Sequence, residues 1–327
     1  MHGERRPTGV APRPQARCRA MSRAQPSVPG VFWPKDRAVS SDDGATITYT
    51  FLGPDDGRVV ALCSGFLCPD TWWYYLAPAL EHAGYRVLLF HYRGIATSTL
   101  PAAAGPEAFT IDRFARDLRA IVDHEDLDDI VLVGHSMGVQ VMLDAYHLMP
   151  GRTTGVVALT GPYASPVRTL YGRRELIYLY EIVRRALTMT YPPLLNAGWR
   201  LAWRRLPFLT IGRAVRAFGP RTSEAIVQSY VEHAAAMDPR LVIRIAEGMH
   251  SHDAMEYLPE VKVPALVVVG GKDPFSPPKL GYDMIKAMPD GVLRTVPEGT
   301  HGTILEYPEL VNEFVLDFLD SLDSGAA

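Results

Sequence analysis

A serine hydroxyl at position 136 is the first candidate for chemistry in this sequence. Ser136 is the centre of the pentapeptide Gly-His-Ser-Met-Gly at residues 134–138, which follows an apolar run and precedes a helical pattern. A G-x-S-x-G motif between a strand and a helix predicts a nucleophile elbow, a sharp turn that exposes the serine oxygen at the end of a sheet. Glycines on both sides keep side-chain bulk out of such a turn. We therefore expect Ser136 to be a nucleophile, which needs a base, an acid and oxyanion donors.

Asp273 and His301 are the candidate acid and base. A serine is activated when a base within hydrogen-bonding reach takes its proton and a carboxylate orients that base. Asp273 stands on a Gly-rich turn directly after an apolar run, and its alternative role is to cap the helix that follows. His301 lies between glycines in the order Ser, Asp, His, and a surface histidine is its alternative. His135 is expected to pack, while His250 and His252 are weaker candidates for the base.

Two backbone N–H groups are expected to form an oxyanion hole. One belongs to Met137, the residue after the serine. The other comes from the loop over residues 62–67, where Gly65 allows a close approach of the backbone and Phe66 is the expected donor. Such a donor contributes ~2.7–4 kcal/mol to the transition state of acyl transfer.

The candidate residues follow short apolar strands that alternate with amphipathic helices. We predict strands at 45–52, 59–63, 86–90, 130–133, 156–159, 265–270 and 291–296. We predict helices at 71–83, 111–122, 139–148, 279–287 and 308–322. This alternation indicates an α/β protein with a mostly parallel sheet covered by helices on both faces.

The sequence divides into a tail, a core in two parts and a helical insertion. Residues 1–28 carry six arginines and no apolar stretch of signal-peptide length, so we expect a disordered tail, or a mis-called start with Met21 as the true first residue. Residues 29–161 and 261–327 are the two parts of the core. Residues 162–260 show helical patterns without buried strands. An insertion there would lie over the carboxyl ends of the strands, where open α/β sheets bind ligands, and is predicted to be a helical cap.

The composition is that of a soluble globular protein, with 47% hydrophobic and 21% charged residues and a net charge of −3. Three cysteines are too few for a disulfide framework, and no Cys/His cluster has zinc spacing. A reducing, cytoplasmic compartment is therefore expected. The sequence contains no run of 18 apolar residues, so no transmembrane helix is predicted.

Taken together, five motifs resemble the α/β-hydrolase superfamily, and more narrowly its lid-bearing branch of serine esterases, monoacylglycerol-lipase-like and epoxide-hydrolase-like proteins. The motifs are Ser64-Gly65-Phe66, the segment His-Tyr-Arg-Gly-Ile-Ala-Thr-Ser at 91–98, the pentapeptide at 134–138, Gly271-Lys272-Asp273 and Gly299-Thr300-His301-Gly302. The resemblance covers about residues 45–322. It implies the α/β-hydrolase fold with a helical cap inserted after the strand that follows the nucleophile helix. It also implies the same catalytic triad, Ser136, Asp273 and His301, and the same oxyanion donors, Phe66 and Met137.

This sequence departs from the family pattern at two places. The family usually has His-Gly where Ser64 precedes Gly65, and it usually has an aspartate where the segment at 91–98 begins with His91. Neither departure removes a catalytic group, but both would reshape the mouth of the pocket. The serine at position 136 argues against epoxide hydrolases and haloalkane dehalogenases, because members of those groups use an aspartate nucleophile.

We expect a carboxylic ester hydrolase, like a serine esterase or lipase, that acts on a small-molecule, lipophilic acyl ester through an acyl-Ser136 intermediate. The alternative enzyme is a thioesterase or acyltransferase for acyl groups bound to CoA or to a carrier, whose phosphates arginines would contact. The alternative from another class is a catalytically silent binding protein with the same fold. No metal and no organic cofactor is expected, because the triad needs none.

The predicted cap carries the clue to partners. From Pro166 to Thr222 the sequence has eleven arginines, no lysine and two acids, interleaved with tyrosines, tryptophans and leucines. Arginine beside aromatic and aliphatic residues on a helix is typical of contact with an anionic membrane surface. The alternative is a solvated helix face whose arginine stems cover the core. No nucleic-acid motif is present, so we expect no nucleic-acid partner. The oligomeric state is left open.

Overall fold

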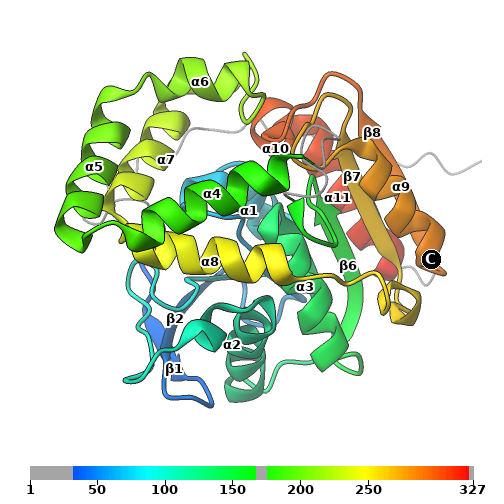
Figure 1. Ribbon diagram of the computed structural model, residues 1–327. Helices are drawn as coiled ribbons and strands as arrows, with labels where there is room; N and C mark the ends of the chain where they lie inside the picture. Colours follow the sequence, from blue (N-terminus) through cyan, green and yellow to red (C-terminus); the bar gives the residue numbers. More distant parts are fainter. Residues whose placement is uncertain (1–31, 167–174, 324–327) are drawn as a thin grey trace, which may run out of the picture.

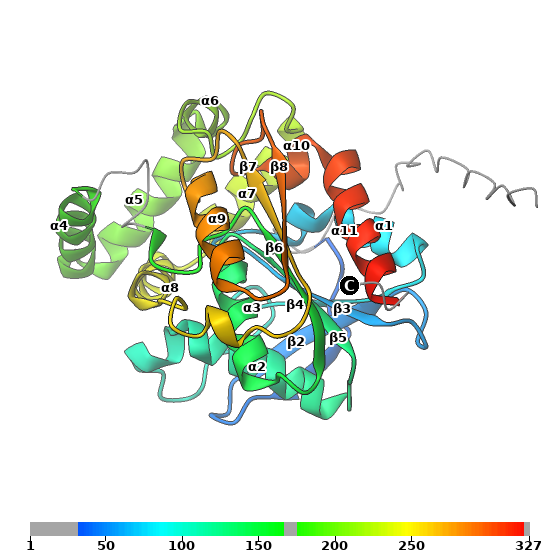
Figure 2. The ribbon, with the colours of Figure 1, turned by 90° about the vertical axis from the view of Figure 1, so that its right-hand side faces the viewer.

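The computed structural model describes residues 32–166 and 175–323, so the expected tail at 1–28 lies outside the described residues. Eight strands form one sheet, which Figures 1 and 2 show with helices on both sides. The strands are β1 (Arg37–Ser40), β2 (Thr46–Leu52), β3 (Val59–Cys63), β4 (Arg86–Phe90), β5 (Ile130–His135), β6 (Thr153–Leu159), β7 (Ala265–Gly270) and β8 (Gly291–Val296).

The sheet is mostly parallel, as expected. Its strand order is β1-β2-β4-β3-β5-β6-β7-β8. The pairs β1–β2 and β2–β4 are antiparallel, and every later pair is parallel. The carboxyl ends of β3, β5, β6, β7 and β8 therefore meet at one edge. This is the edge at which a doubly wound sheet places its ligand site.

Helices follow the parallel strands and supply the two outer layers. They are α1 (Leu76–His82), α2 (Ile111–His124), α3 (Met137–Leu148), α4 (Leu176–Met189), α5 (Pro192–Arg205), α6 (Phe208–Ala214), α7 (Glu224–Ala236), α8 (Pro239–Ser251), α9 (Pro278–Ala287), α10 (Thr303–Glu306) and α11 (Pro308–Asp323). Helices α2, α3 and α9 lie on one face of the sheet, and α1 and α11 lie on the other (Figure 2).

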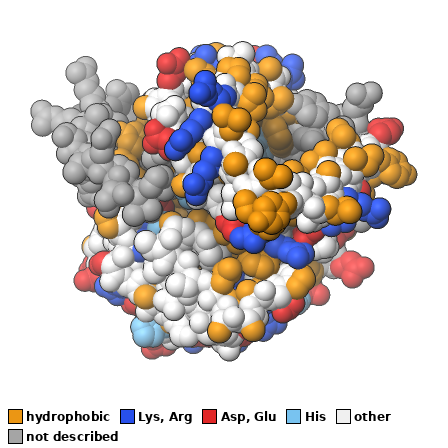
Figure 3. Space-filling view, turned by 60° about the vertical axis from the view of Figure 1, so that its left-hand side comes forward, with side chains coloured by type: hydrophobic (Ala, Val, Ile, Leu, Met, Phe, Trp, Pro, Cys, Tyr) orange, Lys and Arg blue, Asp and Glu red, His pale blue; other side chains and the backbone are white. Residues whose placement is uncertain are grey.

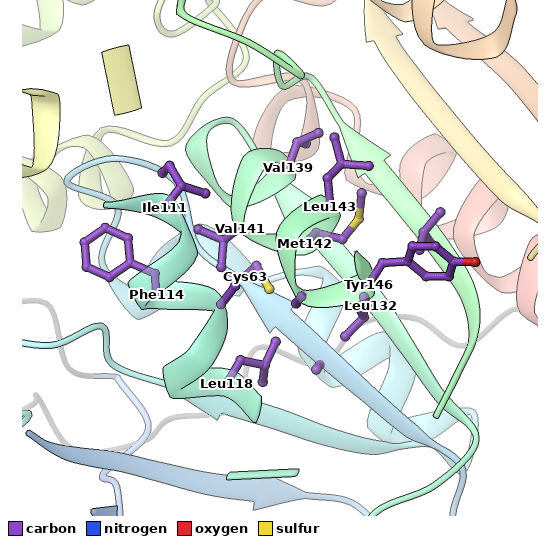
Figure 4. Close-up of a cluster of buried hydrophobic side chains, with 14 of the residues drawn as sticks. Cys63, Ile111, Phe114, Leu118, Leu132, Val139, Val141, Met142, Leu143 and Tyr146 are labelled. Carbon is purple, nitrogen blue, oxygen red and sulfur yellow. The ribbon is translucent and has the colours of Figure 1, made fainter. Parts of the chain in front are cut away.

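Successive side chains of a strand point to opposite faces of the sheet, and this alternation divides the core into two layers. In β3, Val59, Ala61 and Cys63 belong to the cluster beneath α2 and α3, while Val60 and Leu62 belong to the cluster beneath α1 and α11. The side chains of α2 and α3 meet over the strands in the first cluster (Figure 4). Because both faces are covered, strands with continuous apolar sequence are the ones that fit.

Two elements differ from the sequence-based prediction. The strand β1 was not expected, because it is four residues long, mostly exposed and paired on one side only. The helix predicted at 71–83 is two elements, a 3-10 turn at Asp70–Trp73 and α1 from Leu76. Both are apolar at helical spacing, so hydrophobic periodicity did not separate them. The remaining predicted elements are present, with ends that differ by a few residues.

Helices α4 to α8 lie between β6 and β7, within the region predicted to be a cap. Helices α5, α6 and α7 lie at the upper left of Figure 1, and α4 and α8 run across the front of the molecule in that view. The expected boundaries after residues 161 and 260 fall in the connections that follow β6 and precede β7. Within residues 32–166 and 175–323, no helix has both the length and the apolar composition to cross a membrane.

Candidate active site

Ser136 occupies the turn between β5 and α3. Its φ is 54° and its ψ is −122°, a conformation that a non-glycine residue rarely takes. A Cβ on Gly134 would collide with the backbone of Gly138, and a Cβ on Gly138 would collide with the carbonyl oxygen of Cys63. Glycine is therefore required at both positions, because the turn packs directly against its own backbone and against the backbone of β3.

His301 and Asp273 lie beside this serine. The Nε2 atom of His301 is 2.8 Å from the Oγ atom of Ser136, and its Nδ1 atom is 2.9 Å from the Oδ2 atom of Asp273. Asp273 follows β7 and is 3% exposed, and His301 follows β8. The structure thus brings together the three residues that the sequence singled out. A serine hydroxyl that donates to an imidazole, backed by a buried carboxylate, is an arrangement that can produce an attacking alkoxide.

Asp273 is held in place by its own turn. Its Oδ1 atom accepts hydrogen bonds from the backbone N–H groups of Phe275 (2.8 Å) and Ser276 (3.1 Å). Its Oδ2 atom accepts one from the hydroxyl of Ser276 at 2.8 Å. Helix α9 begins later, at Pro278, so Asp273 orders the turn but does not cap that helix. These bonds fix the carboxylate that faces His301.

The loop that carries His301 is tied to other segments through its backbone. The N–H of His301 donates to the carbonyl of Arg216, and the hydroxyl of Thr160 donates to the carbonyl of His301, both at 3.2 Å. Thr160 (φ 40°) and Arg216 (φ 58°) both have positive φ. Residues with such strained backbone conformations persist where contacts with the surrounding structure hold them in place. The sequence did not point to Arg216, because a backbone acceptor has no residue-type signature.

Glu306 joins the same loop to the helical insertion. This carboxylate is 5% exposed and accepts the backbone N–H of Gly219 at 2.5 Å and the backbone N–H of Thr300 at 3.1 Å. It also accepts the hydroxyl of Thr300. A buried carboxylate is stable when such donors surround it. Glu306 therefore fixes the residue before His301 and the segment at 219 relative to each other.

His135 packs beneath the site, as expected. Its Nε2 atom accepts a hydrogen bond from the indole N–H of Trp72 at 3.1 Å, and its ring centroid is 5.3 Å from that of His301. Burial, with a further contribution from His301, lowers the pKa of His135 well below its ordinary value, so its ring is neutral at pH 7. A neutral ring places no charge beside His301.

The two other candidate bases lie elsewhere. The Nδ1 atom of His250 is 2.5 Å from the Oγ atom of Ser165, and the Nε2 atom of His252 is 2.7 Å from a carboxylate oxygen of Asp144. Neither ring lines the pocket that contains Ser136. His301 is the candidate base in the described structure.

The loop expected to supply an oxyanion donor lies against the serine. A Cβ on Gly65 would lie 2.9 Å from Sγ of Cys68 and from Nδ1 of His135 and 3.0 Å from Cβ of Ser136, so any larger residue would force these neighbours to shift. Phe66 and Met137 both line the pocket with Ser136. Met137 is the first residue of α3, so its N–H has no partner one turn earlier in the helix. The residues at which the donors are expected therefore surround the serine.

The first departure from the family pattern has a structural role. The Oγ atom of Ser64 accepts a hydrogen bond from the indole N–H of Trp73 at 2.9 Å. The carbonyl of Ser64 accepts one from the hydroxyl of Tyr92 at 3.0 Å. Ser64 thereby anchors the start of the loop to η1 (Asp70–Trp73) and to the segment at 91–98.

The second departure belongs to a buried polar cluster. The Nε2 atom of His91 is 3.6 Å from one oxygen of Asp70, and the ammonium of Lys35 is 2.8 Å from the other. Both His91 and Lys35 have lowered pKa values, chiefly because they are buried, and Asp70 has a lowered pKa because His91 and Lys35 outweigh its burial. The backbone N–H groups of Phe32 and Trp33 also donate to Asp70. The cluster fixes the residue at which the loop after Gly65 ends.

A pocket of about 350 Å³ opens above Ser136. Its walls come from the core and from the helical insertion, and its lining is mostly apolar: Phe66, Cys68, Trp72, Ser136, Met137, Pro162, Pro166, Trp203, Phe208, Ile211, Gly212, Val215, Ala217, Phe218, Tyr230, Met249, Phe275 and His301. Burial raises the pKa values of the Cys68 thiol and the Tyr230 phenol, so both are neutral at pH 7. Ser136 and His301 thus lie on the wall of a mostly apolar pocket.

A wider groove adjoins this pocket. It has a volume of about 1030 Å³ and runs between α5, α6 and α7, where Arg200 and Arg204 lie on its wall. The rings of Trp203 and Phe208 stack with a centroid distance of 4.0 Å and line both the groove and the pocket. Within the described ranges, no group of three or more His, Cys, Asp or Glu side chains could hold a metal ion.

Comparison with known proteins agrees with this architecture. Bifunctional epoxide hydrolase 2 of Mus musculus is 22% identical over 303 residues, which cover 83% of this chain and 53% of that protein. An esterase from Exiguobacterium antarcticum superposes with a TM-score of 0.68 and 19% identity, covering 87% of this chain and 99% of its own. A bromoperoxidase from Bacillus anthracis superposes with a TM-score of 0.66 and 21% identity, covering 87% of this chain and 100% of its own. At such identities, likeness to a solved structure shows the fold alone.

The family model described as the alpha/beta hydrolase family matches residues 60–314, which include the elbow, the acid and the histidine. The expected fold class is therefore confirmed, and the chain belongs to the alpha/beta hydrolase family.

Proposed function

We propose that this protein is a serine hydrolase that cleaves a lipophilic carboxylic ester. The observation that carries the proposal is the hydrogen-bonded series Ser136–His301–Asp273 on the wall of an apolar pocket. A surface histidine or a helix cap would not account for two such bonds between residues 28 and 165 positions apart. The apolar lining favours an acyl chain over a polar group.

The proposed reaction has two halves. The Oγ atom of Ser136 attacks the ester carbonyl carbon while Nε2 of His301 takes the hydroxyl proton. The carbonyl oxygen becomes an oxyanion that accepts hydrogen bonds from the N–H groups of Phe66 and Met137. The bond to the leaving alcohol then breaks, and His301 gives that alcohol the proton. Asp273 stabilises the imidazolium formed in between.

Water completes the cycle. His301 removes a proton from water, whose oxygen attacks the acyl carbon bound to Ser136. The second oxyanion collapses, the carboxylic acid leaves, and the proton returns to the Oγ atom of Ser136. The two halves together consume one ester and one water and release an alcohol and a carboxylic acid.

An epoxide substrate fits this serine poorly. Attack by Ser136 on an epoxide carbon would form an ether, which water does not hydrolyse, whereas attack by a carboxylate forms an ester. A thioester remains the second candidate, because Arg200 and Arg204 on the adjoining groove could bind the phosphates of an acyl-CoA. The ester is preferred because those two arginines lie outside the pocket that holds Ser136.

A fluorophosphonate probe and a chain-length series test the proposal. We expect the probe to label wild type and the control variant Ser321→Ala, but not Ser136→Ala. With p-nitrophenyl esters, kcat/KM should rise about fourfold for each methylene that the pocket buries, since each contributes ~0.8 kcal/mol. Absence of labelling at Ser136, with no activity on esters or acyl-CoA, would favour a silent binding protein. Preference for acyl-CoA over esters of equal chain length would favour the thioesterase.

A further inference from the structure

Helices α4 to α6 carry a concentration of exposed hydrophobic side chains. Thirteen large hydrophobic residues are exposed in the described parts of the chain, and ten of them lie between residues 178 and 211. They are Tyr178, Leu179, Ile182, Val183, Met189, Tyr191, Leu194, Leu201, Leu206 and Ile211. We call this set the insertion face. Exposed apolar side chains concentrated in one region mark interaction sites on soluble proteins.

The insertion face is also basic. From Leu176 to Ala214 the sequence has six arginines and a single acid, Glu181. Arg184 pairs with Glu181 and with Glu247, at 2.7 and 2.9 Å. The other five are exposed, and among residues 32–166 and 175–323 no ion pair involves them: Arg185, Arg200, Arg204, Arg205 and Arg213. Their charge is therefore available to an external anion.

Apolar and basic side chains share the same surface. On α5, Leu194, Leu201 and Arg205 are spaced by seven and four residues, which places them on one stripe of the helix. Leu194 is 67% exposed and Leu201 is 59% exposed. Figure 3 shows hydrophobic and basic side chains interspersed on the side of the molecule that includes the insertion.

The insertion face reaches the mouth of the pocket above Ser136. Ile211 is 37% exposed and also lines that pocket. Trp203 of α5 and Phe208 of α6 line it as well. A lipid surface in contact with α5 and α6 would thus lie beside the entrance to the pocket.

We propose that the insertion face docks on an anionic phospholipid surface. Leucine, tyrosine and methionine side chains would enter the interfacial region, and the five exposed arginines would bind lipid phosphates. A second copy of this chain fits less well, because a two-fold contact would bring two sets of unpaired arginines together. The supply of a lipophilic ester from that surface to Ser136 rests on the proposed function, whereas the docking itself does not.

Vesicle co-sedimentation at low salt tests the docking. The protein is mixed with vesicles of phosphatidylcholine alone or with about one-third phosphatidylglycerol. We expect stronger binding to the anionic vesicles, weakened by salt. The variant Arg185→Gln/Arg205→Gln/Arg213→Gln should bind roughly a hundredfold more weakly, since each arginine near the surface contributes about fivefold. The charge-matched control, Arg37→Gln/Arg119→Gln/Lys279→Gln, removes three cations from other elements and should bind like wild type.

A second pair of variants tests the apolar contribution. Leu194→Ser/Leu201→Ser should weaken binding about tenfold or more, while the control Tyr282→Ser/Val292→Ser, at two other exposed apolar positions, should not. Four results would overturn the proposal: no binding to anionic vesicles, equal binding to both vesicle types, equal losses in variants and controls, or a dimer that only Leu194→Ser/Leu201→Ser dissociates.

The same assay separates docking from catalysis. Ser136→Ala should bind vesicles as wild type does, and the variants of the insertion face should still hydrolyse a short soluble ester. Binding by a protein that hydrolyses no ester would refute the proposed function and leave the docking intact. Hydrolysis by a protein that binds no vesicle would do the reverse.

Discussion

Replacement of Glu306 by glutamine should loosen the loop that carries His301. Oε1 of Glu306 accepts the N–H of Gly219 and the hydroxyl of Thr300, and Oε2 accepts the N–H of Thr300. In Glu306→Gln the amide oxygen can replace one of these acceptors, but the amide NH₂ then faces a donor. One hydrogen bond to a buried charge is lost, and two donors are left opposed.

The expected loss of stability follows from those contacts. A hydrogen bond to a charged group contributes ~1.5–3 kcal/mol, and an unsatisfied buried donor adds ~1–3 kcal/mol to the cost. We therefore expect Glu306→Gln to lower the free energy of unfolding by about 3–5 kcal/mol. For a domain of this size, Tm falls by ~2–4 °C for each kcal/mol, so the shift should be roughly 6–20 °C.

The effect on activity should appear in kcat. Displacement of a catalytic group by about 1 Å can reduce the rate about a hundredfold. Below its lowered Tm, Glu306→Gln should lose ten- to a hundredfold in kcat on a short p-nitrophenyl ester, with KM little changed because Glu306 does not line the pocket. Differential scanning fluorimetry and steady-state kinetics measure the two quantities. Glu309→Gln, at an exposed glutamate on α11, is the control.

A Tm within 1 °C of wild type together with an unchanged kcat would refute this reasoning. Equal losses in Glu306→Gln and Glu309→Gln would refute it too, because the effect would then follow from charge alone.

Three further perturbations have defined outcomes. Gly138→Ala pushes a methyl group into the carbonyl of Cys63, so we expect a loss of ~1–3 kcal/mol in urea unfolding and slower fluorophosphonate labelling; unchanged labelling would contradict the tight elbow. Asp117→Asn leaves the fully buried Arg93 with one charged partner, and we expect a cost of ~3–5 kcal/mol in the same assay, whereas a cost below 1 kcal/mol would mean that Arg93 finds solvent. The pKa of His135 is lowered on folding, so the unfolded chain binds the proton more readily. Stability should be full above about pH 6.5 and fall by up to ~1.4 kcal/mol per pH unit below it. His135→Gln should reduce that slope in a Tm series from pH 7 to 5, and an unchanged slope would assign it to other groups such as His91.

Local patterns were sufficient for most of the fold. The strands β3, β4, β7 and β8 have the predicted bounds. For β3, β4 and β7 the reason is that a strand covered on both faces is a nearly continuous apolar run between turn residues, whereas β8 is a partly exposed edge strand. The elbow at Ser136 was also readable, since its glycines are required by contacts within one turn and with one neighbouring strand. The edge strand β1 was not readable from the sequence, because it pairs with a neighbour on one side only and most of its side chains are exposed.

The sequence by itself determined which residues could react and in what order they follow the strands. Only the tertiary structure decided that His301 stands 2.8 Å from Ser136, because that distance depends on how β5, β7 and β8 align in the sheet. It also revealed Glu306 and the carbonyl of Arg216 as supports of the histidine loop, since a carboxylate or a backbone oxygen shows its partners only after folding. The same holds for the arginines of the insertion, whose ion pairs and exposure depend on helix packing and not on composition.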